Sequence, residues 1–213
     1  MQLSAEIRWF WPENPPSGLK DWFVNASGDV FAAGGGKPGR EDEYLRDPKQ
    51  VELGIKRRGG GKGIEVKGLV VECLGDLAAG PFVGPIELWT KWVSEPLKID
   101  GIPTIKIKKQ RWLRKFDGGG SSPKEIRLDA DEKLAEKEEL PTRGCNVELT
   151  YVQIADQGGD WWTLGFEAFG TISTVEADLR AVAATLNQRQ PPRLEGGLLA
   201  SYPMWLKTKV LPV

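Results

Sequence analysis

The sequence predicts a β-rich protein built on an antiparallel barrel or a strongly curved sheet, with helices at its periphery. Segments that alternate polar and apolar residues follow one another along the chain, and turn-forming residues separate them. Only one clear amphipathic helix is present, and it comes late. No internal repeat or domain linker interrupts the pattern, so we expect one domain over residues 1–213.

The N-terminal half supplies five of the expected strands. Residues 3–11 alternate between two faces, and the prolines that follow end the segment because proline cannot donate to a sheet ladder. Residues 19–24 fit a short helix or a short strand, and residues 29–32 fit a short strand inside a Gly-rich loop. The other strands expected in this half cover residues 41–45, 52–58, 63–71 and 86–94.

The C-terminal half adds three long strands and the clearest helix. Strands are expected at residues 104–116, 145–155 and 160–170, and the last two form a hairpin around a Gly-rich turn. Residues 174–186 predict a helix, because apolar side chains recur there at helical spacing after Thr174, a residue suited to the N-cap.

Three other segments in this half are less regular. Residues 118–123 are rich in Gly and Ser and fit a flexible connection. Residues 129–139 are highly charged and fit either an exposed helix or a loop. Residues 199–210 are expected to close the sheet as a last strand.

Composition excludes several classes of function. The net charge of −1 gives no argument for a nucleic-acid or membrane partner, and no apolar run approaches the ~20 residues of a membrane span. The chain has no histidine, which removes His-based triads and most zinc sites. Cys73 and Cys145 are isolated and the first residues are polar, so a cytoplasmic location is expected.

Charged residues recur at every second position of several expected strands. Lys56 and Arg58 share one face of their strand, because strand side chains alternate with period 2. Glu65 and Lys67 share one face of the next strand, and both faces of residues 105–113 carry cations. Such a face either points to solvent or lines the lumen of a barrel, and the pattern alone leaves both interpretations open.

The order of these motifs resembles that of the triphosphate tunnel metalloenzymes, also called the CYTH group. The plan of that family begins with a strand of alternating acids ending in a cation. It continues through cation-bearing strands and finishes with acidic strands and a helix. The resemblance covers roughly residues 3 to 186. The matching segments are Glu6 and Arg8, followed by residues 44–48, 55–58, 64–68, 109–111, 147–150, 165–168 and 174–186.

The resemblance implies an eight-stranded antiparallel tunnel with a polar lumen. Cations in such a lumen bind a triphosphate or polyphosphate through charge-assisted hydrogen bonds, and carboxylates hold Mg²⁺ or Mn²⁺. A metal-positioned water then attacks the terminal phosphorus without help from histidine. The implied phosphate-binding residues are Arg8, Lys56, Arg58, Lys67, Lys109 and Arg111. The implied metal ligands are Glu6, Glu148 and Glu167, with Glu6 and Glu167 also expected to be catalytic.

Two positions depart from the family pattern. The first strand of the family carries two acids, and Ser4 stands here in place of the first of them. A late strand of the family also carries two, and Gly165 stands here in place of one. Fewer anionic ligands weaken the binding of a divalent ion. Two functions therefore follow from the resemblance: a metal-dependent phosphohydrolase, or a non-catalytic anion-binding protein that has lost part of its metal site.

A third hypothesis is the binding of RNA or of a single nucleic-acid strand. Basic and aromatic residues interleave in residues 111–116, as base-stacking surfaces require. The overall charge of −1 opposes this hypothesis, so a nucleic-acid partner is not expected.

Overall fold

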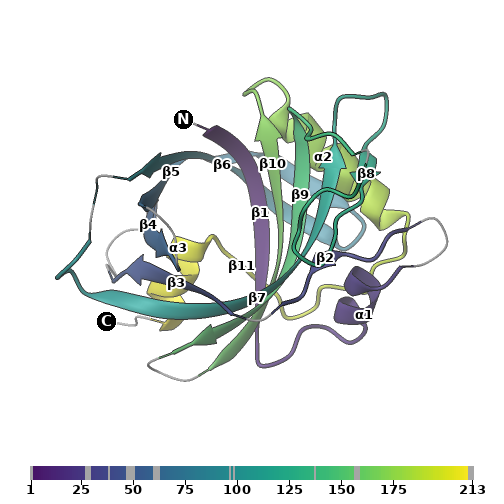
Figure 1. Ribbon diagram of the computed structural model, residues 1–213. Helices are drawn as coiled ribbons and strands as arrows, with labels where there is room; N and C mark the ends of the chain where they lie inside the picture. Colours follow the sequence, from purple (N-terminus) through teal and green to yellow (C-terminus); the bar gives the residue numbers. More distant parts are fainter. Residues whose placement is uncertain are drawn as a thin grey trace.

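The centre of the molecule is a closed barrel of eight antiparallel strands (Figure 1). The structure is a computed structural model that describes residues 2–26, 30–37, 39–46, 51–59, 63–95, 97, 99–136, 138–155 and 159–210. Around the barrel the strands follow the order β1, β10, β9, β7, β3, β4, β5 and β6, and β6 pairs again with β1. The predicted barrel is confirmed.

The elements have the following bounds. The barrel strands are β1 (Gln2–Pro12), β3 (Arg40–Leu45), β4 (Leu53–Arg58), β5 (Ile64–Ala79), β6 (Phe82–Ser94), β7 (Thr104–Asp117), β9 (Gly144–Ile154) and β10 (Asp160–Gly170). Short strands β2 (Gly34–Gly35) and β8 (Lys124–Ile126) pair with β7, and β11 (Leu198–Leu199) pairs with β1. The helices are α1 (Leu19–Val24), α2 (Val175–Asn187), α3 (Tyr202–Trp205) and the π-helical stretch η1 (Leu206–Val210). None of the helices in the described ranges is long and apolar enough to cross a membrane.

Most predicted elements are found where they were expected, but β6 begins at Phe82 instead of residue 86, and β8 was not predicted. Strand β5 continues to Ala79, because irregularities after Leu69 and Val71 let the long hairpin with β6 bend without ending. Of the two alternatives for residues 129–139, the described part is a loop and contains no helix. The short strand expected at 29–32 is found instead at Gly34–Gly35, and Asp29 lies outside the described residues.

The prediction of a last strand over residues 199–210 is wrong. Only Leu198 and Leu199 pair with β1, and the chain then turns into α3 and η1. The Ser201 hydroxyl accepts a hydrogen bond from the Met204 backbone N–H, and Pro203 occupies the first turn, where its missing N–H has no cost. Figure 1 shows α3, in yellow, inside the ring of strands.

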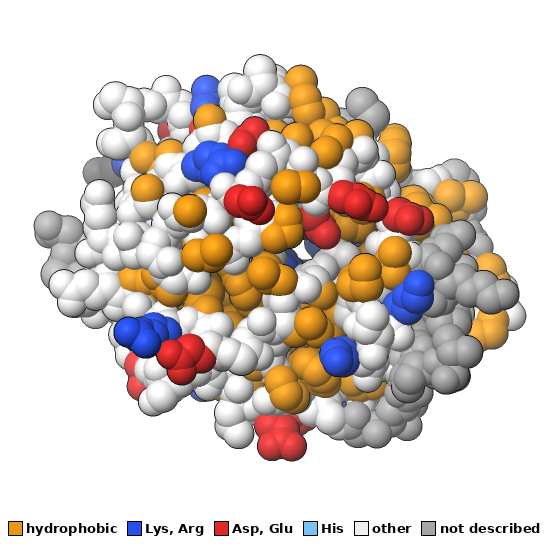
Figure 2. Space-filling model, turned by 180° about the vertical axis from the view of Figure 1, so that it is seen from behind, with side chains coloured by type: hydrophobic (Ala, Val, Ile, Leu, Met, Phe, Trp, Pro, Cys, Tyr) orange, Lys and Arg blue, Asp and Glu red, His pale blue; other side chains and the backbone are white. Residues whose placement is uncertain are grey.

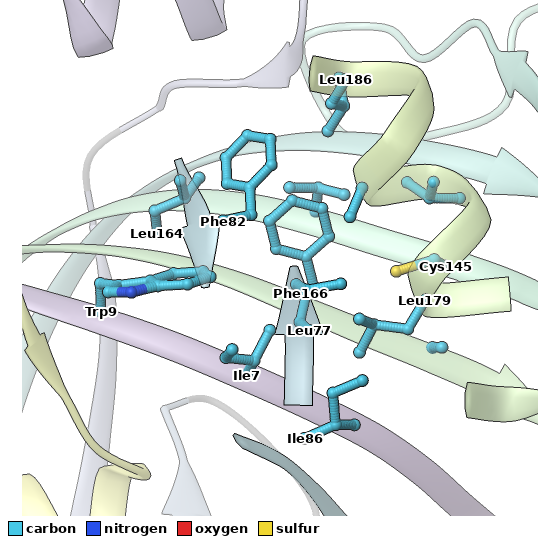
Figure 3. Packing of buried hydrophobic residues seen from close by; sticks show 14 of the residues in the cluster. Ile7, Trp9, Leu77, Phe82, Ile86, Cys145, Leu164, Phe166, Leu179 and Leu186 are labelled. Atoms are coloured by element: carbon cyan, nitrogen blue, oxygen red, sulfur yellow. The ribbon is translucent and has the colours of Figure 1, made fainter. Parts of the chain in front are cut away.

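The main hydrophobic core lies outside the barrel, between the strands and α2. Ile7 and Trp9 project from β1 into this core, where they meet Phe82 and Phe166 from neighbouring strands. Figure 3 shows these side chains in one cluster with Leu179 and Leu186 of α2. On the part of the wall that this core covers, the outward faces of the strands carry apolar residues, and the alternate residues face the lumen.

The exterior carries charges of both signs. On the face shown in Figure 2, the coloured Lys, Arg, Asp and Glu side chains are dispersed among hydrophobic ones. Lys106 and Lys108 of β7 belong to this exterior. This arrangement differs from that of the lumen, where charged side chains are concentrated.

Candidate functional site

The lumen contains a cavity lined by charged side chains from all eight barrel strands. Its empty volume, including open solvent at the mouth, is about 950 Å³. The lining includes five acidic residues: Glu6, Glu65, Glu87, Glu148 and Glu167. It includes eight basic residues: Arg8, Arg40, Lys56, Arg58, Lys67, Lys91, Lys109 and Arg111. All nine residues that the sequence analysis assigned to binding, metal or catalytic roles line this one cavity.

Each of the eight cations has a carboxylate within ion-pairing distance, and Asp42 pairs with three of them. Asp42 is fully buried in the wall behind the cavity. Its carboxylate lies 2.9 Å from Arg40, 3.4 Å from Lys109 and 3.7 Å from Lys56. Burial alone would raise the pKa of Asp42, but the three cations hold it well below its usual range. Asp42 is therefore a permanent internal counter-ion.

Lys109 is the most deeply buried lysine of the cavity. Its ammonium donates a hydrogen bond to the Tyr44 hydroxyl at 2.7 Å and lies 3.9 Å from the centre of the Tyr202 ring. Burial lowers the pKa of Lys109 well below its usual range, although the charge of Asp42 opposes the change. Lys56 shows the same effect, since burial lowers its pKa in spite of Glu65 at 2.9 Å.

Arg8 reaches across the barrel wall to Glu148 because the residue between them has no side chain. Gly165 of β10 is opposite Arg8 of β1 on one side and opposite Glu148 of β9 on the other. The Arg8 guanidinium lies where a Cβ of residue 165 would be, and it forms an ion pair with Glu148. Arg111 donates a hydrogen bond to the other Glu148 oxygen at 3.1 Å. Burial would raise the pKa of Glu148, but Arg8 and Arg111 hold it well below its usual range.

A row of three acids crosses the neighbouring part of the wall. Glu87, Glu6 and Glu167 lie in register on β6, β1 and β10. Glu6 accepts hydrogen bonds from Lys67 at 2.5 Å and from Ser4 at 2.5 Å, and Glu167 lies 3.9 Å from Lys91. Burial raises the pKa of Glu6 despite the opposing charge of Lys67. Glu167 is the cross-strand neighbour of Glu6 on the same face, so its negative charge raises the pKa of Glu6 further.

The predicted metal ligands do not form a metal centre. Within the ranges that the structure describes, no three His, Cys, Asp or Glu side chains are grouped to hold a metal ion. The Glu148 carboxylate is already bonded to Arg8 and Arg111, and the Glu6 carboxylate already accepts hydrogen bonds from Lys67 and Ser4. At Gly165, where the resemblance expects an acid, the space is filled by Arg8. The residues present therefore do not fit Mg²⁺ or Mn²⁺.

Sequence reasoning missed several residues of the cavity. Arg40 lies just before the predicted strand 41–45, and it alternates with Asp42 and Tyr44 on one face. Glu87 and Lys91 lie in the predicted strand 86–94, where the same period-2 spacing could have identified them. Tyr202 gave no such signal, because its segment was predicted as a strand.

No model of a known protein family matches the chain, and no curated protein sequence matches it either. The function of the protein is therefore inferred from the geometry and charge of the cavity.

Proposed function

We propose that the protein binds a phosphate-rich anion, such as a triphosphate or a short polyphosphate, in the lumen of its barrel and without a divalent metal. The cavity supports the proposal, because its eight basic side chains outnumber the five acidic ones of the lining, and still outnumber the carboxylates when Asp42 and Glu132 behind the lining are counted. Arginine and lysine bind phosphate oxygens through charge-assisted hydrogen bonds. Several of these donors converge on one enclosed space, where an anion is shielded from water.

The protonation behaviour of the lining points in the same direction. The acids Asp42 and Glu148 have pKa values held well below their usual range by surrounding cations. The lysines Lys56 and Lys109 have pKa values lowered by burial, which their carboxylate partners only partly offset. Surrounding cations thus outweigh the burial of Asp42 and Glu148, whereas the carboxylates near Lys56 and Lys109 do not outweigh the burial of these two lysines. An incoming anion supplies the negative charge that those lysines lack.

Thermal denaturation with sodium tripolyphosphate tests the proposal. A ligand that binds only the native state stabilises it by RT ln(1 + [L]/Kd), or about 2.7 kcal/mol at a hundredfold excess over Kd. We expect this stabilisation in the presence of a metal chelator. Sodium sulfate at equal ionic strength controls for general salt effects. Stabilisation no larger than that of sulfate contradicts the proposal.

Two adjacent lysines provide a matched pair of variants. Lys109 faces the cavity, whereas its neighbour Lys108 is exposed on the outer face of β7. Lys109→Met removes one charge from the site and is expected to weaken tripolyphosphate binding about tenfold or more, since a hydrogen bond to a charged group contributes about 1.5–3 kcal/mol. Lys108→Met makes the same chemical change and is expected to leave the affinity unchanged. Equal losses in both variants would indicate nonspecific charge attraction.

Metal-dependent hydrolysis is the alternative function. The observation that favours it is the row Glu87, Glu6 and Glu167, whose carboxylates come from neighbouring strands in register. Phosphate release from tripolyphosphate, thiamine triphosphate and ATP distinguishes it from binding alone. We expect no release with or without Mn²⁺. Turnover that requires Mn²⁺ and disappears in Glu6→Gln would replace the binding proposal with a hydrolase.

A further inference from the structure

The charged face of β1 ends abruptly at Phe10. Ser4, Glu6 and Arg8 face the lumen, and Phe10 follows at the same period-2 spacing. Phe10 is fully buried and stacks on Trp205 of α3, with ring centres 4.9 Å apart and planes 8° apart. The lumen therefore changes from polar to aromatic within one strand.

Other strands change character at the same level. Ile105 and Ile107 precede Lys109 on the inward face of β7, and Val152 and Ile154 follow Thr150 on the inward face of β9. These apolar residues form a second hydrophobic cluster with α3 and η1. Its buried members are Phe10, Tyr44, Ile105, Ile107, Val152, Ile154, Trp205, Leu206 and Val210. The C-terminal segment thus fills this end of the barrel.

Tyr202 forms the boundary between the filled end and the cavity. Its ring lies 3.9 Å from the Lys109 ammonium and 4.9 Å from the Arg8 guanidinium, and it stacks on Tyr44 at 5.9 Å. The next residue, Pro203, packs against Gly54 of β4, where a Cβ would come within 3.1 Å of the proline ring. The ring of Tyr202 covers the inner side of two cations, so an anion can reach them only from the opposite side.

Exposure of the cations increases away from Tyr202. The side chains of Lys109 and Arg8 are 7% and 8% exposed, that of Arg111 is 27% exposed, and that of Arg58 is 50% exposed. Arg58 is the last residue of β4, at the end of the barrel opposite the aromatic cluster. The cavity is therefore open at the Arg58 end and closed at the Tyr202 end.

We propose that the lumen is a blind pocket that takes the free end of a linear phosphate chain, with Tyr202 as the floor that limits how far the chain enters. This inference rests on the proposed function and adds a restriction to it. A ligand must present an uncapped terminal phosphate, because the chain cannot pass through the barrel. Cyclic phosphates and chains capped at both ends lack such a terminus.

Two matched ligand pairs test the restriction in the wild-type protein, by calorimetry at constant ionic strength without divalent metal. The first pair is linear tripolyphosphate and cyclic trimetaphosphate. The second is adenosine 5′-tetraphosphate, capped at one end, and diadenosine tetraphosphate, capped at both. We expect the member with a free end to bind at least about tenfold more tightly in each pair, a difference of ~1.4 kcal/mol. Diadenosine tetraphosphate binding as tightly as adenosine 5′-tetraphosphate would overturn the blind pocket while leaving anion binding intact.

Variants of Tyr202 test the floor itself. Tyr202→Ala deepens the pocket and is expected to raise the affinity for tetrapolyphosphate relative to tripolyphosphate, whereas Tyr202→Phe keeps the ring and the wild-type ratio. An unchanged ratio in a folded Tyr202→Ala protein rejects Tyr202 as the floor. If Tyr202→Ala does not fold, the ligand pairs on the wild-type protein still decide the question. Failure of every linear phosphate to bind rejects both this inference and the proposed function.

Discussion

The outer and inner faces of the barrel wall are stabilised by different interactions, although they alternate along the same strands. On β10, Phe166 points outward into the apolar core beneath α2. Its neighbour Glu167 lines the cavity on the inner side, and its other neighbour, Gly165, contacts the Arg8 guanidinium on that side. Burial of apolar area stabilises the outer face. The inner face is connected by ion pairs, whose attraction offsets part of the cost of removing the charges from water.

Because of this difference, residues that stabilise the fold and residues that line the binding cavity occupy adjacent positions on the same strand. The apolar core outside the wall stabilises the barrel, so the inner face can keep cations that are not fully compensated. A barrel with its core inside would have no room for them. Substitutions on the two faces should therefore have different consequences, and four predictions test this from the largest expected effect to the smallest.

Phe166→Ala is expected to reduce the free energy of unfolding by about 3–5 kcal/mol, because it leaves a cavity in a fully packed core. Phe166 packs edge-on against Phe82, with ring centres 5.0 Å apart. Urea denaturation measures the loss. The protein that remains folded should bind tripolyphosphate with wild-type affinity. A loss below about 1 kcal/mol would show that the core does not lie on the outer face.

Gly165→Ala is expected to cost about 1–3 kcal/mol, because the new Cβ collides with the Arg8 guanidinium and forces it to move. The same variant should weaken anion binding by displacing Arg8. Adding Arg8→Lys should recover part of the stability, since the slimmer side chain clears the Cβ. A double-mutant cycle gives the coupling between the two positions. Additive effects would mean that Gly165 does not position Arg8.

The pH dependence of stability and of binding should have opposite signs in the alkaline range. Burial lowers the pKa of Lys109 below 10.5, so between the two values the unfolded chain binds more protons than the folded one. In that window the free energy of unfolding due to Lys109 rises with pH.

Anion affinity should fall over the same pH window, because the Lys109 ammonium is lost. Denaturation midpoints and tripolyphosphate affinities measured across the window test both signs. Lys109→Met is the control. In this variant, neither the free energy of unfolding nor the anion affinity should show the change with pH that Lys109 causes. Affinity that stays constant while the wild-type protein titrates would remove Lys109 from the binding site.

Lys108→Met is expected to change the free energy of unfolding by no more than about 0.5 kcal/mol, because its side chain is exposed on the outer face. Chemical denaturation of this variant beside Lys109→Met compares the two faces at adjacent positions. A loss in Lys108→Met as large as that in Phe166→Ala would show that the outer charges are structural.

The strands and the long helix were predictable because their signals are local. Alternation along residues 3–11 and 160–170 marks each strand, and the apolar stripe of residues 174–186 marks α2. Thr174 does occupy the N-cap of α2, but its hydroxyl donates to the Thr171 carbonyl and does not cap the helix. Cap residues are local signals, whereas cap bonds depend on the surrounding loop.

The conformation of the C-terminal segment, and the cations that occupy the expected metal ligands, were not predictable in this way. Residues 199–210 combine aromatic and apolar residues that suit a strand. They form helices instead because apolar side chains at one end of the barrel lumen pack against them. Glu6 and Glu148 are carboxylates suited to a metal ion by type. The partners that occupy them, Lys67 and Arg8, come from other strands.

By itself the sequence determined which residues alternate, and hence that most strands would have one charged and one apolar face, although both faces of residues 105–113 carry cations. The tertiary structure alone decided that the charged faces point inward, because α2 covers the part of the wall formed by β1, β5, β6, β9 and β10 and removes its apolar side chains from water. It also decided, through the closing of β6 on β1, that cations far apart in the chain share one cavity. Closure and burial are properties of the whole barrel, so no single segment encodes them.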